Sequence, residues 1–562
     1  MRKITVDIIV PVHNAAETIE ETIQSAMTQY IPPFLLEPIA IAREGGISEV
    51  ADSYKRHPLA NIFIDVAVCC QDDGSSDSSL EVLRTMERDY VRHCGKVDDA
   101  TNISTKLLIG TNEGNISLGA GGARNRAAAL REKVDNNSDD CKQTTRSQPS
   151  TKEDCDYFVC MLDSDDVMHP HRIAHQISVM LGLSPLERNT LLLGSTFERM
   201  PIDSTWHYTK WANSLTDERL LLERFREVTI IQPTWMMSKS RFEYLLGYIE
   251  ADERLINAKK SPVYRLIHPN DTTQTLRLAE DIRFFHAHLS ESEDIDRKGT
   301  LKLIRTKTPL MKYRHRAGQS QSSSTPRKLL LQLRVKAFVD MIIRSNRENG
   351  ISAHWSRGFV IWGAGRDGKD FFKELPNDIK SLVRSFVDVD EKKISNGYYV
   401  APKNKMETRI ANKLTSCGIS HKPRRKKPEH WRIPIVHFSL LARDKDKRSK
   451  LIDSWVTREN EHDEFLGRIT KDRPSSNSVK EVNDNIEGVN HGRAAKRQKV
   501  GARPGRAPHS ISNKDKQNLI MVESLSCLPV VVCVSLYRTN GVLEANVNSI
   551  GAEEGKDLWH FS

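Results

Sequence analysis

Three polar motifs each follow a run of apolar, β-branched residues, which is where parallel sheets carry their chemistry. Residues 11–14 (PVHN) follow VDIIV, residues 72–77 (DDGSSD) follow FIDVAVCC, and residues 163–166 (DSDD) follow YFVCML. Because the carboxyl ends of parallel strands meet at one edge of a sheet, we expect the three motifs to lie close together. The sequence therefore predicts a polar site assembled from distant parts of the chain.

The third motif, Asp163-Ser164-Asp165-Asp166, places three carboxylates within four positions. Like charges at this spacing repel one another, so the cluster is disfavoured unless a cation or hydrogen-bond donors lie beside it. A hard divalent ion that also binds diphosphate oxygens would supply that cation. An acidic turn that caps the following helix explains these four residues equally well when they are taken alone.

The elements that must position these motifs alternate between β-rich runs and helical patterns. Strands are expected at VDIIVPV, FIDVAVCC, KLLIG and YFVCML, with helices at about 16–28, about 78–91 and from Ala123. This alternation predicts the α/β class, with a mostly parallel sheet and covering helices. The near-continuous Val and Ile runs are typical of strands that are buried on both faces.

Taken in order, VPVHNAAETIEETI, DDGSSDSS, GAGGARNRAAA and MLDSDD resemble the catalytic domain of family 2 glycosyltransferases. The resemblance implies a GT-A fold, a nucleotide-diphosphate sugar donor, an inverting transfer and a divalent metal cofactor, Mn²⁺ or Mg²⁺. The residues that it implies for binding the nucleotide sugar are Pro11, His13, Asp73, Gly119, Arg124, Asn125 and Asp163. The metal ligands that it implies are Asp165, Asp166 and His315.

Such a transfer needs a base, because a neutral hydroxyl of the acceptor is a poor nucleophile. In LAEDIRFFHAHL, Glu280 and Asp281 begin an amphipathic helix, where the resemblance places the catalytic carboxylate of inverting enzymes. Asp281 is therefore the predicted base, and an acid favoured by the helix dipole is the alternative interpretation. Downstream, Arg316 stands where many family members carry His, so Arg314 or Arg316 is a candidate ligand of the diphosphate.

Further segments resemble members of this family that glycosylate queuosine in tRNA. These are WHYTKWANSLT, QPTWMMSKSRF, FVIWGAGRDGK, FVDVDEKKISNGYYV, RIPIVHF and KDLWHFS. The resemblance implies transfer of galactose from UDP-galactose to the cyclopentenediol hydroxyl of queuosine, with tRNA as the acceptor. Trp206, Tyr208 and Trp211 are then candidates for stacking on splayed bases, although they could equally belong to the core. Two alternatives stay open: transfer of N-acetylglucosamine or another hexose to a glycan or protein, and an inactive nucleic-acid-binding scaffold.

Three regions are expected along the chain. Residues 1–322 form the predicted glycosyltransferase domain, 323–354 a helical linker, and 355–562 a smaller Rossmann-like domain with disordered inserts at 402–430 and 442–516. The turn GAGRDG from Gly363 follows a strand, and a second strand ends at Asp388, as in dinucleotide-binding turns. Because few further strands are recognisable, we favour a degenerate module for acceptor binding or scaffolding over a working cofactor site.

The excess of positive over negative charge lies entirely in the region of these inserts. The net charge is +10, but residues 401–520 hold 28 Lys+Arg against 14 Asp+Glu, whereas the rest holds 56 against 60. We interpret this segment as solvated tails, with a nuclear localisation signal at AAKRQKV as the alternative. No apolar run reaches the roughly 20 residues of a membrane span, and no secretory signal begins the sequence. The expected location is cytoplasmic, and possible nuclear entry rests on that basic run.

Overall fold

The computed structural model describes residues 2–32, 59, 62–93, 102–112, 114, 116–137, 156–250, 262–293, 303–316, 325–344, 352–402, 430–450, 453, 525–534 and 541–561. The chain divides into two compact units. Unit 1 comprises Met1–Ser356, Arg366–Lys380 and Trp559–Ser562, and unit 2 comprises Arg357–Gly365 and Ser381–Leu558. No helix in the described ranges has the length and apolar character needed to cross a bilayer.

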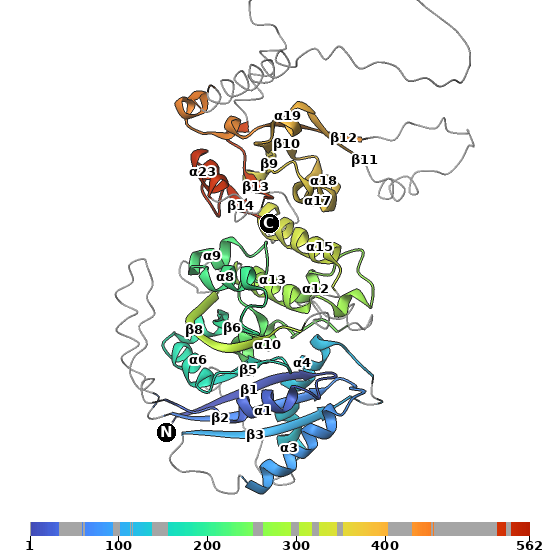
Figure 1. Ribbon diagram of the computed structural model, residues 1–562, viewed down its shortest axis with the longest axis vertical. Helices are drawn as coiled ribbons and strands as arrows, with labels where there is room; N and C mark the ends of the chain where they lie inside the picture. The colour runs from blue at the N-terminus through green and yellow to red at the C-terminus, as the bar shows by residue number, and fades with distance from the viewer. Residues whose placement is uncertain are drawn as a thin grey trace, which may run out of the picture. The chain divides into compact units, whose positions relative to one another are not determined.

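Unit 1 is built on an eight-stranded sheet with the order β3-β2-β1-β4-β7-β6-β8-β5 (Figure 1). Its strands are β1 Arg2–Val12, β2 Ile62–Asp72, β3 Ile103–Thr111, β4 Tyr157–Met161, β5 Val167–Met168, β6 Leu192–Met200, β7 Met236–Ser238 and β8 Leu303–Arg314. The pairs β3/β2, β2/β1, β1/β4 and β6/β8 are parallel, whereas β7 is antiparallel to β4 and β6, and β5 to β8. The predicted α/β class with a mostly parallel sheet is confirmed.

Helices surround this sheet. They include α1 Ile19–Met27, α3 Ser79–His93, α4 Ala120–Ala128, α5 Leu130–Asn137, α6 Arg172–Leu181, α7 Pro185–Thr190, α8 Trp206–Ser214, α9 Asp217–Leu222, α10 Lys239–Tyr244, α12 Pro262–Arg265, α13 Glu280–Glu293 and α15 Arg327–Phe338. Several of them, such as α3, α4, α8, α9 and α10, pack directly on its strands. Helix α4 packs on β1 and β2, and its small residues such as Ala123 and Ala127 are buried. Its small side chains let the helix backbone approach the sheet closely, which brings the following Arg124 to the sheet edge.

The end of the chain contributes to the core of unit 1. Phe561 packs edge-on against Phe371 of α17 (Arg366–Glu374), with ring centres 4.5 Å apart, and 6.1 Å from the ring of Phe338 in α15. Trp559 of β14 (Leu558–His560) lies 6.0 Å from the ring of Phe225. The sequence assigned all of 355–562 to a second domain, whereas these aromatic contacts join α17 and residues 559–561 to unit 1.

Unit 2 contains a smaller sheet with the order β11-β12-β10-β9-β13-β14. Its strands before β14 are β9 Phe359–Trp362, β10 Val383–Asp388, β11 Tyr398–Pro402, β12 His430–His437 and β13 Val530–Val532. Strands β12, β10, β9 and β13 run parallel, as expected for the smaller α/β domain, and β11 is antiparallel to β12. The two predicted inserts lie largely outside the described residues. Residues 442–450 are described, and Arg443 forms a 2.6 Å ion pair with Asp557.

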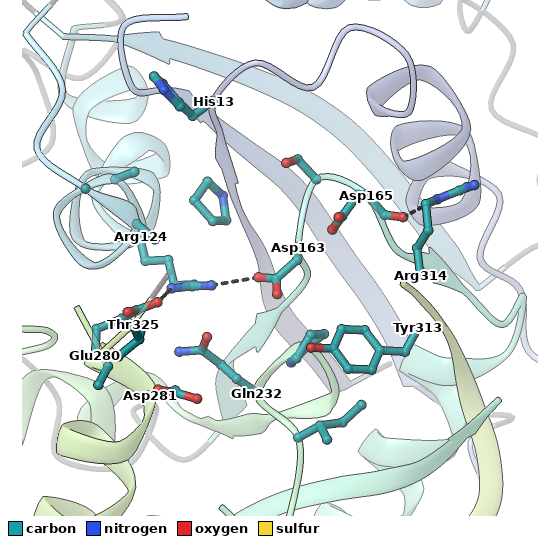
Figure 2. Close-up of a pocket in the computed structure, with 18 of the residues that line it drawn as sticks. His13, Arg124, Asp163, Asp165, Gln232, Glu280, Asp281, Tyr313, Arg314 and Thr325 are labelled. Carbon is teal, nitrogen blue, oxygen red and sulfur yellow. Dashed lines mark hydrogen bonds and ion pairs between the residues drawn. The ribbon is translucent and has the colours of Figure 1, made fainter. Parts of the chain in front are cut away.

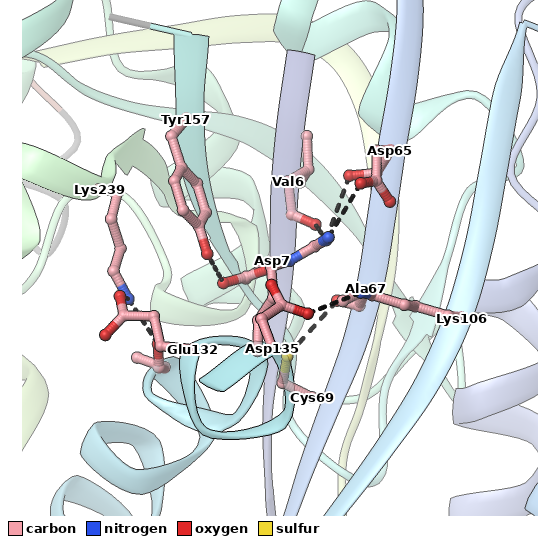
Figure 3. A network of polar contacts seen from close by, with 12 residues as sticks. Val6, Asp7, Asp65, Ala67, Cys69, Lys106, Glu132, Asp135, Tyr157 and Lys239 are labelled. Atoms are coloured by element: carbon pink, nitrogen blue, oxygen red, sulfur yellow. Dashed lines mark hydrogen bonds and ion pairs between the residues drawn. The ribbon is translucent and has the colours of Figure 1, made fainter. Parts of the chain in front are cut away.

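A buried ionic network lies within the sheet of unit 1 (Figure 3). Asp7 of β1 is fully buried and accepts a hydrogen bond from Arg131 Nε at 2.6 Å and another from the hydroxyl of Tyr157 at 2.5 Å. Arg131 also donates to Asp65 of β2 at 3.1 Å. Burial raises the pKa of Asp7, whereas Arg131 and Tyr157 act in the opposite direction. Each oxygen of the Asp7 carboxylate therefore has a partner.

Candidate active site

A cavity of about 1030 Å³ opens at the carboxyl edge of β1, β2 and β4 (Figure 2). The parallel register places Val12 beside Asp72 and Ile9 beside Met161, so the residues that follow these strands meet at one edge. Of the residues predicted for the site, those that line the cavity are Pro11, His13, Asp73, Gly119, Arg124, Asp163, Asp165 and Asp281. The expectation that the three motifs converge is met by the geometry.

Asp73 organises one wall of the cavity. Its carboxylate accepts four hydrogen bonds, each 2.7 or 2.8 Å long, which come from the side chains of Asn112 and Ser117 and the backbone N–H groups of Leu118 and Gly119. Gly119 has a φ of 83°, a left-handed conformation that favours glycine. Asp73 thus fixes the turn that leads into α4, while the His13 ring nitrogen Nδ1 donates to the carbonyl oxygen of Asp73 at 3.1 Å.

Arg124 joins two motifs that are far apart in the sequence. One guanidinium nitrogen donates to Asp163 at 2.7 Å and the other to Glu280 at 2.8 Å, and only 3% of its side chain is exposed. Burial acts to lower the pKa of Arg124, but the charges of Asp163 and Glu280 outweigh it and raise that pKa. The permanently charged Arg124 therefore ties the DSDD turn to the first residue of α13 (Figure 2).

Asp281 is the second residue of α13 and faces the cavity beside Gln232 (Figure 2). Burial, together with the nearby charge of Glu280, raises the pKa of Asp281 to about 7. A carboxylate with a pKa near neutral pH is suited to accept and release a proton. Ala279, which precedes this pair, has a φ of 54°, an unusual and strained conformation for a residue with a Cβ.

Two further carboxylates of the DSDD turn share a raised pKa. Burial and the charge of Asp163 raise the pKa of Asp165, although Arg316, with Nε 3.4 Å from its Oδ2, opposes them. Burial and the charges of both neighbours raise the pKa of Asp166 well above its usual range. Its Oδ1 accepts the backbone N–H of Arg314 at 2.8 Å, but its Oδ2 is buried without a hydrogen bond.

This excess of carboxylate charge fits a divalent cation, since Asp163 and Asp165 present oxygen ligands to the cavity. Asp166 and His315, which were predicted to join Asp165 as ligands, are not among the residues that line it. In the described parts of the chain, no three His, Cys, Asp or Glu side chains are grouped to hold a metal. Magnesium and manganese sites often use one or two carboxylates and complete their shell with water and substrate phosphates, which is the arrangement these residues permit.

Asn125 has a structural role in this geometry. Its side-chain amide donates to the carbonyl oxygen of Tyr248 at 2.9 Å and accepts the N–H of the same residue at 2.8 Å. Asn125 does not line the cavity, so it supports the wall next to Arg124 and is not placed to touch a ligand directly.

Several cavity residues carry no local sequence signal of a site. Arg199 of β6 and Glu227, which precedes a buried segment, were not singled out, and Gln232 was noted only within a resemblance. Arg199 reaches the cavity because β6 pairs with β8 and places it beside Tyr313. Only the pairing of these two strands, which neither strand specifies alone, could have identified Arg199 as a cavity residue.

The three aromatic residues proposed for base stacking have different surroundings. Trp211 is buried and donates its indole N–H to Glu223 at 2.6 Å, so it belongs to the core. Tyr208 lines the cavity, and Trp206 is 54% exposed and stacks on His207 with ring centres 3.7 Å apart. Tyr208 and Trp206 remain available to a ligand.

Asp388, the acidic residue associated with the glycine turn of unit 2, has its hydrogen-bonding capacity filled by groups of the protein itself. Asp388 accepts the backbone N–H of Ala364 at 2.8 Å and the ammonium group of Lys393 at 3.0 Å. Backbone N–H groups of Val389 and Asp390 donate to its other oxygen. Asp388 occupies the position from which an acidic residue of a dinucleotide-binding turn would reach a ribose, and its oxygens are already engaged.

Comparison with known proteins gives distant matches. No family model matches the chain. Among solved structures, residues 1–349 of TarS from S. aureus in complex with UDP-GlcNAc match at 14% identity and a TM-score of 0.31, over 61% of this chain and 68% of that chain. A longer TarS structure matches at 12% identity and a TM-score of 0.32, over 68% of this chain and 51% of that chain. Likenesses at this distance decide neither the substrate nor the reaction.

Proposed function

We propose that unit 1 is a metal-dependent glycosyltransferase that moves a hexose from a nucleotide-diphosphate sugar to a hydroxyl group with inversion. The observation that carries this proposal is the combination, in one cavity, of Asp163 and Asp165 with Asp281, whose pKa is raised to about 7. The first two carboxylates fit a cation that would bind a diphosphate, and Asp281 fits the base that the acceptor hydroxyl requires. The order of motifs that resembles family 2 glycosyltransferases supports the same conclusion.

In this proposal, the donor binds at the edge formed by β1, β2 and β4. Pro11 and His13 border the nucleotide, and the wall held by Asp73 positions it. A divalent metal held by Asp163 and Asp165 would supply positive charge that stabilises the leaving diphosphate. Arg314 and Arg316 line the same part of the cavity and can add hydrogen bonds to phosphate oxygens.

Asp281 then acts on the acceptor. Its carboxylate takes the proton of the attacking hydroxyl while the oxygen of that hydroxyl bonds to the anomeric carbon of the sugar. The bond from the anomeric carbon to the diphosphate breaks on the opposite face, so the nucleoside diphosphate leaves and the configuration inverts. Arg124 keeps Glu280 and Asp163 in place during this step, because it binds both carboxylates.

For the substrates, we propose UDP-galactose as the donor and queuosine in tRNA as the acceptor. This assignment rests on the segments that resemble enzymes modifying queuosine in tRNA, among them WHYTKWANSLT and QPTWMMSKSRF. The first segment holds Trp206 and Tyr208, and the second holds Gln232, and all three are accessible or line the cavity. Transfer of N-acetylglucosamine or another hexose to a glycan or protein is the second candidate.

The test is to incubate the full chain with tRNA containing queuosine, UDP-galactose and Mn²⁺, and to measure the mass of queuosine after digestion. The expected result is a single hexose increment that requires all three components. A parallel incubation with UDP-N-acetylglucosamine identifies the donor, and one with tRNA lacking queuosine identifies the acceptor. Absence of UDP release with every donor and acceptor would contradict the proposed transferase and favour an inactive nucleic-acid-binding scaffold.

A further inference from the structure

Gln232 offers the cavity a hydrogen-bond acceptor that no described group of the protein uses. The residue is 7% exposed, and its amide nitrogen Nε2 donates to the hydroxyl of Tyr248 at 2.9 Å. Tyr248 is fully buried and is held in place by Asn125, which bonds to both its N–H and its carbonyl oxygen. This contact fixes the amide of Gln232 and leaves its carbonyl oxygen Oε1 for another donor. No group in the described ranges donates to Oε1.

The backbone that carries Gln232 is also held from behind. Gln232–Thr234 form the short 3-10 helix η6. Gln176 Nε2 donates to the carbonyl oxygen of Thr234 at 2.9 Å, and Gln176 Oε1 accepts Arg172 Nε at 3.0 Å. Arg172 is fully buried and also donates, at 3.0 Å, to the carbonyl oxygen of Met161, the last residue of β4. The segment of Gln232 is therefore joined to the strand that leads into the DSDD turn.

Asp281 presents a second available acceptor beside Gln232 (Figure 2). Its Oδ1 accepts the backbone N–H of Ile282 at 2.8 Å, whereas its Oδ2 has no hydrogen bond to any described residue. In the proposed reaction, Asp281 takes the only proton of the attacking hydroxyl. That proton cannot also satisfy Gln232, so a ligand that fills this part of the cavity needs another donor for Oε1. A buried amide oxygen that is left unsatisfied costs free energy, which favours a ligand with such a donor.

Glu227 is another carboxylate near Asp281, and it differs from Gln232 in having a cation close by. Burial and the charge of Glu280 are the main causes of the raised pKa of Asp281, and the charge of Glu227 adds to them. Burial lowers the pKa of Arg334, and the charge of Glu227 opposes this effect, so Glu227 lies within electrostatic reach of a guanidinium. That cation partly compensates Glu227. Gln232 is therefore the residue whose acceptor still requires a donor.

We propose that Gln232 accepts a hydrogen bond from a second hydroxyl group of the acceptor, next to the hydroxyl that Asp281 deprotonates. This inference rests on the proposed transferase function and deepens it by assigning a residue that selects acceptors with two neighbouring hydroxyl groups. The second hydroxyl keeps its proton and receives no sugar. Gln232 is a specificity-determining residue here, and Tyr248 is a positioning residue because it acts through the amide of Gln232.

The experiment compares two acceptors: tRNA that contains queuosine, and the same tRNA with a synthetic queuosine in which hydrogen replaces the ring hydroxyl that receives no sugar. The ratio of kcat/KM for the two acceptors measures the contribution of the second hydroxyl. Wild type should prefer the diol by about 10- to 100-fold, because loss of the hydrogen bond leaves a buried acceptor unsatisfied. Gln232→Met, which has no amide oxygen, should reduce this preference to about twofold or less. Gln232→Glu, which keeps an acceptor oxygen, should retain most of it.

Two further variants separate this role from a general effect on structure. Gln29 is a buried glutamine that does not line the cavity, and its amide bonds to the N–H of Ile173 and to the carbonyl oxygen of His169, both at 3.0 Å. Gln29→Met should therefore leave the preference for the diol unchanged. Tyr248→Phe removes the hydroxyl that orients the amide of Gln232, so its preference should lie between those of wild type and Gln232→Met.

Three results would overturn the inference. The first is a wild type without preference for the diol, or a loss in Gln232→Met that is equal for both acceptors, which would leave Gln232 only structural support. The second is weaker binding of UDP-galactose to Gln232→Met with unchanged binding of UDP in calorimetry, which would assign Gln232 to the donor sugar. The third is loss of the preference in Glu227→Leu but not in Gln232→Met. A failure of the transferase proposal is distinguishable from all three, because wild type itself would then release no UDP.

Discussion

Two groups of carboxylates in unit 1 differ in what surrounds them. Asp7 is enclosed in the sheet, but Arg131 and Tyr157 each donate to one of its oxygens (Figure 3). The DSDD turn is enclosed at the end of β4, yet its nearest charges include other carboxylates, and Asp166 Oδ2 has no hydrogen bond. Burial raises the pKa in both groups. Neighbours lower it at Asp7, whereas neighbouring carboxylates raise it further at Asp165 and Asp166.

This difference separates a structural carboxylate from a ligand-binding one. A fully paired buried charge holds strands together and has no capacity left for a ligand. An incompletely paired cluster costs stability in the absence of a ligand, and the cost is recovered when a cation binds. Substitutions in the two groups should therefore affect different properties.

The largest effect is expected for Asp165→Ala. This change removes a cavity carboxylate that is proposed to hold the metal, so transfer should fall on the order of 10³-fold or more, given the several kcal/mol that a metal contributes. The melting temperature should be unchanged or slightly higher, because like-charge repulsion is relieved. Donor turnover and thermal unfolding measured on the same protein check both parts. Glu81→Ala, an exposed carboxylate on α3, is the control.

A large effect on stability, and not on the site, is expected for Arg131→Met. It leaves Asp7 buried without its cationic partner, which should lower the free energy of unfolding by about 3–5 kcal/mol. Urea unfolding measures the loss, and kcat of the remaining folded protein should stay within about twofold of wild type. The double change Asp7→Asn with Arg131→Met removes both charges and should recover most of the stability. Failure of that recovery would argue against charge pairing as the cause.

A smaller loss of rate is expected for Asp281→Asn. The amide cannot accept the proton of the acceptor, so kcat should fall by about 10²-fold, while the dissociation constant of UDP stays within about twofold. Asp217→Asn, an exposed acid in the first turn of α9, is the matched control for a dipole effect at a helix start. Equal losses in the two variants would support the dipole interpretation and remove Asp281 from the role of base.

The pH dependence should show the smallest change. Because Asp281 acts only when it is ionised and its pKa is raised to about 7, kcat should fall by about tenfold for each pH unit below 7 and level off above it. Stability changes with pH in the opposite direction. Because the pKa of Asp281 is higher in the folded protein than in the unfolded chain, the folded protein binds this proton more tightly. Raising the pH from about 4 to 7 therefore lowers the free energy of unfolding. At pH 8 the Asp281→Asn protein should therefore melt at a higher temperature than wild type.

The central part of this fold and site could be predicted from the sequence because its signals are local. Val and Ile runs identified β1, β2 and β4, and the polar residues directly after them had to meet at one sheet edge. The position of Asp281 at the start of α13 followed from an apolar repeat in a single segment. In each case, a few consecutive residues determine both the element and the residue at its end.

The other side of the cavity could not be predicted in this way. Arg199 reaches it only because β6 and β8 pair across a separation of more than 100 residues, and nothing in either strand specifies that partner. The orientation of Asp166 away from the cavity, with its backing by the N–H of Arg314, also depends on that distant strand. The spacing of Asp163, Asp165 and Asp166 predicted that all three would lie beside a bound cation. In the structure, Asp166 is fully buried and does not line the cavity.

The aromatic residues at 559–561 have a consequence for the biosynthesis of the protein. Strand β1 is an interior strand of the sheet, and Phe561 packs against Phe338 and Phe371, which precede it by more than 180 residues. Unit 1 therefore cannot complete this part of its core until residues 559–561 have been synthesised. A chain that stops before Trp559 should therefore leave Phe225, Phe338 and Phe371 without these aromatic contacts and should be less stable than a chain that contains them.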